Sequence, residues 1–379
     1  MRLPAGVSTM ILQGLGMPDL NHRTKSRYTQ RLHKIRKQMT MLSDDFASSI
    51  PTEGNYSDAY FAYNFPMNLM KTIVVVQQIR SWYAALFSNK RRVSVLDIGC
   101  GEGAGMLGFY HGLRDQGDKR ALDLVGIDGS RKMLRRAKAL AAWTRKSDRR
   151  LKTRFLSQNI DSAYRCEPKG RFDVILLVNS LAEIIPEEVI PTQFIKAVAR
   201  CLTDDGLVII IEPALKRLAH RVMRLRSSLV KQRTLRVLLP CLHDNDCALL
   251  QVEKRNEWCH QSISWSPPDF LKIINQGLNR EIDILKFGYL VLAKSGVTLI
   301  RPQGHLAISQ LLTEKGKKRC FLCTPAGRVE LVRLNRARTS CNESFDKIKK
   351  GSVIEVHDVT MKKLSYWQVK DNTIISILK

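Results

Sequence analysis

The sequence lacks the long apolar runs and the leader that would send a chain into or across a membrane. No stretch of about 18 apolar residues occurs, so we expect no transmembrane helix and no membrane partner. No basic segment followed by an apolar one opens the chain, which argues against a secretory signal. No Arg-rich, acid-poor leader stands apart from the fold either. We therefore expect a bacterial cytoplasmic protein, with the mitochondrial matrix as the alternative.

Acidic residues are scarce. The 379 residues include 35 Asp and Glu against 62 Lys and Arg, a formal net charge of +27. Residues 21–42 hold seven basic residues and no acid, and residues 215–239 hold eight and no acid. A third basic run comprises Arg131, Lys132, Arg135, Arg136, Lys138, Arg145, Lys146, Arg149 and Arg150. Clustered positive charge favours a nucleic-acid partner over a generally basic, solvated surface.

A disulfide framework is also not expected. The nine cysteines are an odd number, and no secretion signal accompanies them, so reduced thiols are favoured. Their spacing then bears on metal binding. Cys166 and Cys201 suit the role of small buried apolar residues.

The chain divides into three regions by pattern. Residues 1–90 read as basic and helical, and residues 91–296 alternate strands and helices, which is typical of a parallel α/β sheet. Residues 297–379 contain short β-segments punctuated by Gly and Pro. We predict a helical N-terminal region, a Rossmann-like domain with a cysteine-bearing insertion at 240–260, and a small β-rich C-terminal module.

A glycine-rich turn follows the first predicted strand, residues 93–98. Gly99, Gly101 and Gly103 allow a sharp turn and a close approach of a ligand to the backbone. The second predicted strand ends at Asp128, which is placed to accept hydrogen bonds from both ribose hydroxyls of a nucleoside cofactor. The alternative is a doubly wound fold that binds nothing here.

The turn, with Asp97 two residues before its first glycine, resembles that of class I S-adenosylmethionine-dependent methyltransferases. The resemblance implies that Asp97 and the glycines flank the methionine part of this cofactor and that Asp128 holds the ribose. It also implies that Asn159, Ile160 or Asp161 lies by the adenine. Asn179 is predicted as a further residue of the cofactor site.

Catalytic residues are not apparent. The Asn/Asp-Pro-Pro-aromatic turn of many amino-group methyltransferases is replaced by Asn179-Ser180-Leu181-Ala182-Glu183, and no nucleophilic cysteine stands there. Asn179 and Glu183 either line a substrate site or cap and solvate the start of a helix.

Three cysteines lie close together in the insertion. Cys241 and Cys247 flank an Asp/Asn-rich loop, and Cys259 follows Trp258. A fourth ligand would complete a site for zinc or for an iron–sulfur cluster. The candidates are Cys323, its rival Cys320 and, for zinc, His243 or His260.

These motifs resemble a family. Pro-Cys-x-His-Asp-x-x-Cys from Pro240, Trp258-Cys259-His260, residues 288–293 and Leu-Cys-Thr-Pro-x-Gly from Leu322 are similar to the ribosomal small-subunit methyltransferase-like family. That family includes mitochondrial small-subunit assembly factors (the methyltransferase-like protein 17 family) and bacterial homologues. Leu242 stands where many members have Pro.

The resemblance implies a four-iron four-sulfur cluster held by Cys241, Cys247, Cys259 and Cys323, binding of S-adenosylmethionine, and association with small-subunit rRNA during assembly. We expect a monomeric rRNA-binding assembly factor with weak or no catalysis and no DNA partner. Basic helices around Arg23–Lys37 and Lys216–Arg236 would contact RNA phosphates. The alternative is an active rRNA methyltransferase. A radical enzyme is disfavoured, because the Cys-x3-Cys-x2-Cys loop is missing.

Overall fold

The computed structural model describes residues 1–17, 25–48, 57–161, 168–250, 257–276, 278, 282–297 and 299–378. It divides into two compact units, residues 1–211 with 263–285, and residues 212–262 with 286–379. Neither unit begins or ends at residue 90 or residue 296, where the sequence pattern changes, so the domain boundaries predicted there stay predictions.

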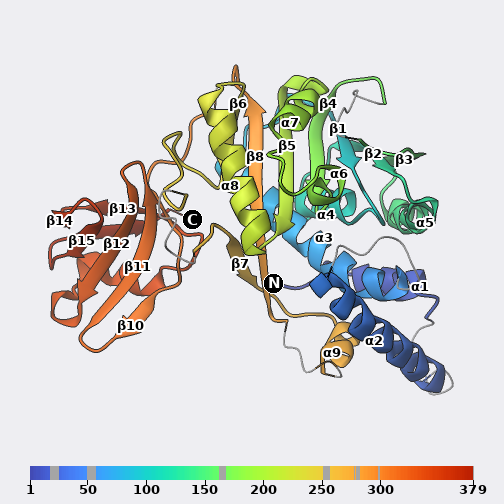
Figure 1. Cartoon of the computed structure of the whole chain (residues 1–379), viewed down its shortest axis with the longest axis horizontal. Coiled ribbons are helices and arrows are strands. Elements are labelled where there is room, and N and C mark those ends of the chain that lie inside the picture. Colours follow the sequence, from blue (N-terminus) through green and yellow to red (C-terminus); the bar gives the residue numbers. More distant parts are fainter. Residues whose placement is uncertain are drawn as a thin grey trace. The chain divides into compact units, whose positions relative to one another are not determined.

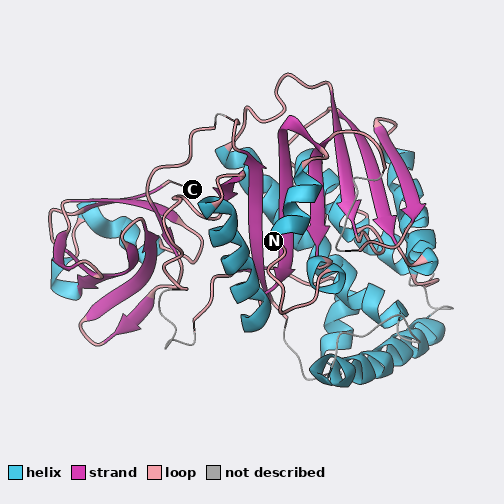
Figure 2. Cartoon of the chain, turned by 45° about the horizontal axis from the view of Figure 1, so that its top comes forward, coloured by secondary structure: helices cyan, strands magenta, loops and turns pink. Residues whose placement is uncertain are grey.

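The first unit is a parallel sheet with helices packed on it (Figure 1, Figure 2). Its strands run in the order β3-β2-β1-β4-β5, all parallel. This is the order of a Rossmann-like fold, with its switch point between β1 and β4. The strands are β1 (Arg92–Ile98), β2 (Ala121–Asp128), β3 (Leu151–Ser157), β4 (Phe172–Val178) and β5 (Leu202–Pro213). The predicted α/β fold class is therefore confirmed.

The helices of this unit include the predicted N-terminal ones. They are α1 (Val7–Gly14), α2 (Lys25–Ser48), α3 (Ser57–Trp82), α4 (Ala104–Arg114), α5 (Arg131–Ser147), α6 (Leu181–Ile184), α7 (Thr192–Ala199) and α9 (Asp269–Gln276). In the part of the chain that the structure covers, no helix is both long and apolar enough to span a bilayer.

Helix α3 is buried around most of its circumference because α4 approaches it closely. A Cβ added to Gly108 would lie 2.7 Å from the Cβ of Thr72, and one added to Gly112 would lie 2.8 Å from the Cβ of Val76. Only glycine permits this approach of the two backbones. The close packing holds the polar residues of α3 in fixed positions within unit 1.

The second unit contains the cysteine-bearing segment and the C-terminal β-module. Its first elements are α8 (Lys216–Lys231), β6 (Leu235–Leu239), β7 (Gln261–Ser264) and β8 (Ile284–Lys294), with β6 and β8 antiparallel. The module follows as β9 (His305–Ala307), β10 (Leu312–Glu314), β11 (Lys317–Thr324), β12 (Gly327–Leu334), η1 (Asn335–Ala337), η2 (Ser340–Lys347), β13 (Val353–His357), β14 (Thr360–Lys363), β15 (Tyr366–Val369) and β16 (Ile374–Ile377).

The module is one mainly antiparallel sheet in the order β14-β15-β12-β11-β9-β13-β16, with β10 beside β11. Side chains alternate across β11, so Cys320 and Leu322 face the apolar core with Phe345, whereas Cys323 lies on the other face. The predicted β-rich module is confirmed, and the pleat separates the two rival cysteines.

Candidate functional sites

The glycine turn after β1 has the backbone shape that its sequence predicts. Gly99, Gly101 and Gly103 have φ values of 70°, 50° and 87°. Because L side chains rarely adopt these angles, the turn requires glycine. A Cβ on Gly99 would also lie 2.5 Å from the Cβ of Ser180, so β1 and the segment after β4 touch at this point.

Asp128 anchors the turn. One of its carboxylate oxygens accepts a hydrogen bond from the backbone N–H of Gly101 (2.8 Å), and the other accepts one from Ser130 (2.8 Å). Asn159, after β3, lies beside Gly129: its Oδ1 is 2.7 Å from where a Cβ of Gly129 would be. The carboxyl ends of β1, β2 and β3 therefore bring Asp128, Asn159 and the glycine turn to one edge.

Asp97 is a buried carboxyl with unused hydrogen-bonding capacity. Its side chain accepts a hydrogen bond from the N–H of Met106 (2.9 Å), but its Oδ1 is buried with no partner among the described residues. Burial, assisted by the charge of Asp128, raises the pKa of Asp97 to about 7. Such a group favours a positively charged ligand.

Asn179 lies on the other side of the switch point, with a left-handed φ of 57°. Its Nδ2 donates to Oδ1 of Asn68 (2.8 Å), which also accepts from Nζ of Lys71 (3.1 Å). Oδ1 of Asn179 is buried without a partner in the described structure. Burial and then the charge of Asp128 raise the pKa of Glu183 to about 7.

The sequence analysis missed Asn68 and Lys71. Both are buried in α3, at 7 % and 8 % exposure. The available signal was two polar residues inside an otherwise apolar helical run. Their contact partner, Asn179, lies more than 100 residues away, so no local pattern indicated their role.

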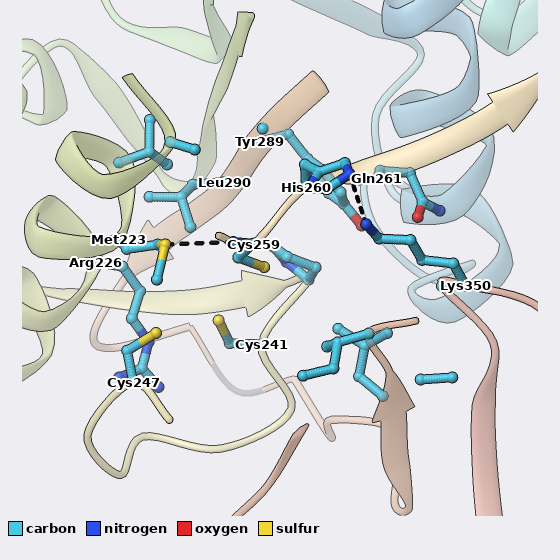
Figure 3. A pocket seen from close by; sticks show the side chains of 18 residues that line it. Met223, Arg226, Cys241, Cys247, Cys259, His260, Gln261, Tyr289, Leu290 and Lys350 are labelled. Atoms are coloured by element: carbon cyan, nitrogen blue, oxygen red, sulfur yellow. Dashed lines mark hydrogen bonds between the residues drawn. The ribbon is translucent and has the colours of Figure 1, made fainter. Parts of the chain in front are cut away.

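The cysteine site lies within unit 2. Cys241, Cys247 and Cys259 line one pocket of about 640 Å³ that opens to solvent, together with Arg226 and Lys350 (Figure 3). Burial, and then the charges of the Cys241, Cys247 and Cys323 thiolates, raise the pKa of the Cys259 thiol well above its usual value. These three predicted ligands therefore share one site.

Cys323 approaches the site from the β-module. Nε2 of His243 lies 3.4 Å from its Sγ, and Nδ2 of Asn245 donates to the carbonyl oxygen of Pro325 (2.8 Å). The rival Cys320 is completely buried in the core of the module. Within the described ranges, no three His, Cys, Asp or Glu side chains are arranged so that they could hold a metal ion. The side chains of the four cysteines are therefore not arranged around one common point as metal ligands would be.

The cysteines outside this site differ in whether their thiols are free. Cys100, Cys320 and Cys341 are free thiols, as are the four of the cysteine site. Cys201 is buried, as predicted, but it is disulfide-bonded. The expectation of reduced thiols is therefore wrong at this residue. Cys166 lies outside the described residues.

Arg226 holds the cysteine loop in place. It is 2 % exposed, and its guanidinium donates to the backbone carbonyl oxygens of His243 and Asn245. Arg221 is also buried, at 5 % exposure. The basic run around residues 216–236 is predicted to contact RNA, and these two of its arginines are buried in the protein.

Replacing Arg226 tests this role. Arg226→Met keeps a long side chain but removes the donors to the carbonyl oxygens of His243 and Asn245, so the free energy of unfolding should fall by about 3 kcal/mol. Arg224→Met, on the same helix with an exposed side chain, is the matched control and should change it by less than about 0.5 kcal/mol. Chemical denaturation measures both, and equal effects would contradict the role.

The parallel sheet, its glycine turn and Asp128 together define a Rossmann-like α/β fold. The family model described as mitochondrial small ribosomal subunit Rsm22 matches residues 55–350. The match covers most of the chain, and the chain belongs to that family, as its motifs predicted.

Two solved structures with similar folds are distant in sequence. A putative class I S-adenosylmethionine-dependent methyltransferase from Listeria monocytogenes is 14% identical, with 78% of this chain and 81% of that one covered and a TM-score of 0.37. A putative RNA methyltransferase from Pyrococcus horikoshii is 10% identical, with coverages of 59% and 81% and a TM-score of 0.33. Among curated proteins, no sequence matches.

Proposed function

We propose that this protein binds small-subunit rRNA as an assembly factor, with S-adenosylmethionine and a metal centre as bound cofactors and with little or no methyl transfer. The observation that carries the proposal is the shared pocket of Cys241, Cys247 and Cys259, with Cys323 beside His243 of the same cysteine loop, in a chain of a small-subunit family. The excess of positive charge suits an RNA partner.

The residues at the sheet edge fit S-adenosylmethionine. Oδ1 of Asp97 and Oδ1 of Asn179 are buried acceptors without donors among the described residues, and the cofactor offers a cationic ammonium and sulfonium. Asp128 has lone pairs left for ribose hydroxyls, and Asn159 stands next to it for the adenine. Asp97, Gly99, Gly101, Gly103, Asp128, Asn159 and Asn179 are the proposed binding residues.

The cofactor should bind more tightly as pH rises toward neutrality. The cationic ligand prefers the ionised Asp97, whose pKa is raised to about 7, so affinity should increase by up to about tenfold per pH unit from pH 5 to 7 and then level off. The same linkage applies to folding. Because the pKa of Asp97 is higher in the folded protein than in the unfolded chain, the protonated carboxyl stabilises the fold; this stabilisation is fully present below about pH 4 and is lost as pH rises through 7. Calorimetric titration at several pH values measures the affinity, and Asp97→Asn should flatten its pH dependence. An equally steep profile in that variant would rule Asp97 out.

The donor set of the cysteine site fits a metal centre. Four thiols are a donor set that suits an iron–sulfur cluster or zinc. We propose a four-iron four-sulfur cluster on Cys241, Cys247, Cys259 and Cys323. A bound cluster would link the segment after α8 to strand β11. Anaerobic purification with iron, sulfide and zinc analysis tests this: absorbance near 400 nm supports the cluster, and stoichiometric zinc overturns it in favour of the alternative.

Active methyl transfer to rRNA is the competing function. Glu183, with its raised pKa, and the oriented Oδ1 of Asn179 are the groups that could position a base. Against it, the amide of Asn179 is already bonded to Asn68. Incubating the protein with labelled S-adenosylmethionine and small-subunit rRNA decides: retained RNA binding without label transfer supports the assembly factor, whereas transfer abolished by Asp97→Ala establishes the enzyme.

The compartment and the assembly state are further proposals. The family name fits the mitochondrial alternative, whereas the bacterial cytoplasm stays a prediction. We expect a monomer that binds rRNA in preference to DNA, and sedimentation with a competition assay between the two nucleic acids tests both points.

A further inference from the structure

One side of α5 carries a stripe of exposed cations. Arg131, Arg135, Lys138 and Arg145 are spaced by four, three and seven residues, which places them within an arc of about 80° on the helix. Lys132 and Lys146 flank this stripe and are exposed as well. The helix, labelled in Figure 1, packs against β2 and the edge strand β3.

These outward cations differ from the inward one on the same helix. Arg136 is paired with Asp58 and Glu102 and lies over the ring of Phe61. By contrast, none of the six exposed cations forms an ion pair within the described ranges. Their charge is therefore available to a partner.

Acids near the stripe do not neutralise it. Asp148, just after the helix, is buried and paired with Arg114 and Arg150. The edge strand β3 adds two more exposed cations, Lys152 and Arg154. The exposed acid nearest in sequence beyond β3 is Asp161, which follows the strand by four residues.

The stripe suits a nucleic-acid backbone in length and shape. A 17-residue helix is about 25 Å long, enough to follow several phosphates. The exposed Ala139 and Ala142 lie between Lys138 and Arg145. Their small side chains leave room for a nucleic-acid backbone to approach the middle of the helix closely. A lipid surface suits it less, because no exposed large apolar side chain of the described residues lies on α5.

We propose that α5, with the edge strand β3, docks on the phosphate backbone of a folded RNA segment. The inference rests on the proposed rRNA binding and adds a surface distinct from α2 and α8. On α8 the buried Arg221 and Arg226 serve the fold, whereas the cations of α5 project outward. Contacts to phosphates position a protein without reading bases, so the surface should bind by shape and charge.

The test uses the full chain and an in vitro transcript of small-subunit rRNA in filter binding at several salt concentrations. The variant Arg135→Glu/Lys138→Glu/Arg145→Glu should weaken binding tenfold to hundredfold and reduce the slope of log affinity against log salt by about two to three. The control, Lys362→Glu/Lys363→Glu/Lys370→Glu, makes the same charge change at exposed positions of the β-module and should alter affinity less than about threefold.

The outcomes separate this inference from the function on which it rests. If the unaltered protein does not bind the transcript, the proposed function fails. If it binds, and the α5 variant binds as well as the control with an unchanged melting temperature, the docking surface is wrong. Equal losses in both variants would show a diffuse charge effect and overturn it too, as would tighter binding to anionic vesicles than to RNA.

Discussion

Cys259→Ser is expected to remove the proposed metal centre and to lower the melting temperature of the protein by about 10 °C. Cys259 lines the same pocket as Cys241 and Cys247, so its replacement would remove one of the proposed ligands. Binding free energy at a metal site contributes to folding, and a few kcal/mol corresponds to a shift of this size in a domain of about 200 residues. Metal analysis and thermal unfolding of anaerobically purified protein measure both effects.

Two further cysteine variants serve as controls. Cys341 is an exposed free thiol in η2, so Cys341→Ser should keep the full metal content and melting temperature. Cys320→Ser should lower stability without removing metal, because Cys320 packs in the apolar core of the β-module, whereas Cys323→Ser should remove the metal. Metal retained in Cys323→Ser and lost in Cys320→Ser would reverse the assignment of the fourth ligand.

Asp128→Ala should weaken the binding of S-adenosylmethionine by at least about 100-fold. A carboxylate that accepts hydrogen bonds from two ribose hydroxyls contributes about 1.5–3 kcal/mol for each bond, and the alanine loses both. Isothermal titration calorimetry measures the affinity. The variant should still fold, because the glycine turn keeps its bonds from Gly99 and Cys100 to the carbonyl of Ile127.

Asp123→Ala is the matched control for this prediction. Asp123 lies on the same strand, and its carboxylate pairs with Arg92 at a partly exposed position, so cofactor affinity should stay within about twofold. Comparable losses of affinity in the two variants, or none in Asp128→Ala, would remove Asp128 from the ribose site.

Much of the fold was predictable because its signals are local. Val174–Val178 is a continuous apolar run within β4, a strand that is buried along nearly its whole length, and residues 93–98 became β1 with the glycine turn behind it. Alternating strands and helices restrict the topology to a few arrangements, so the parallel order followed from the pattern.

The candidate sites were predictable only as sets of residues. The spacing of Cys241, Cys247 and Cys259 indicated a thiol site, but whether Cys320 or Cys323 joins it depends on which face of β11 meets the core. A shift of one residue in register reverses that choice, and the register is set by pairing with β12 and β9. The contact of Asn179 with Asn68 likewise depends on the packing of α3 on α4.

The sequence by itself determined the class of fold, the glycine turn with its acid on the next strand, the cysteine motif and the excess of positive charge. These depend on residue types at short spacings. Tertiary structure decided which cations face outward: α8 turns Arg221 and Arg226 inward, whereas α5 keeps its stripe exposed. It did so because burial depends on which side of a helix meets the rest of the fold, and that is settled by packing between segments distant in the chain.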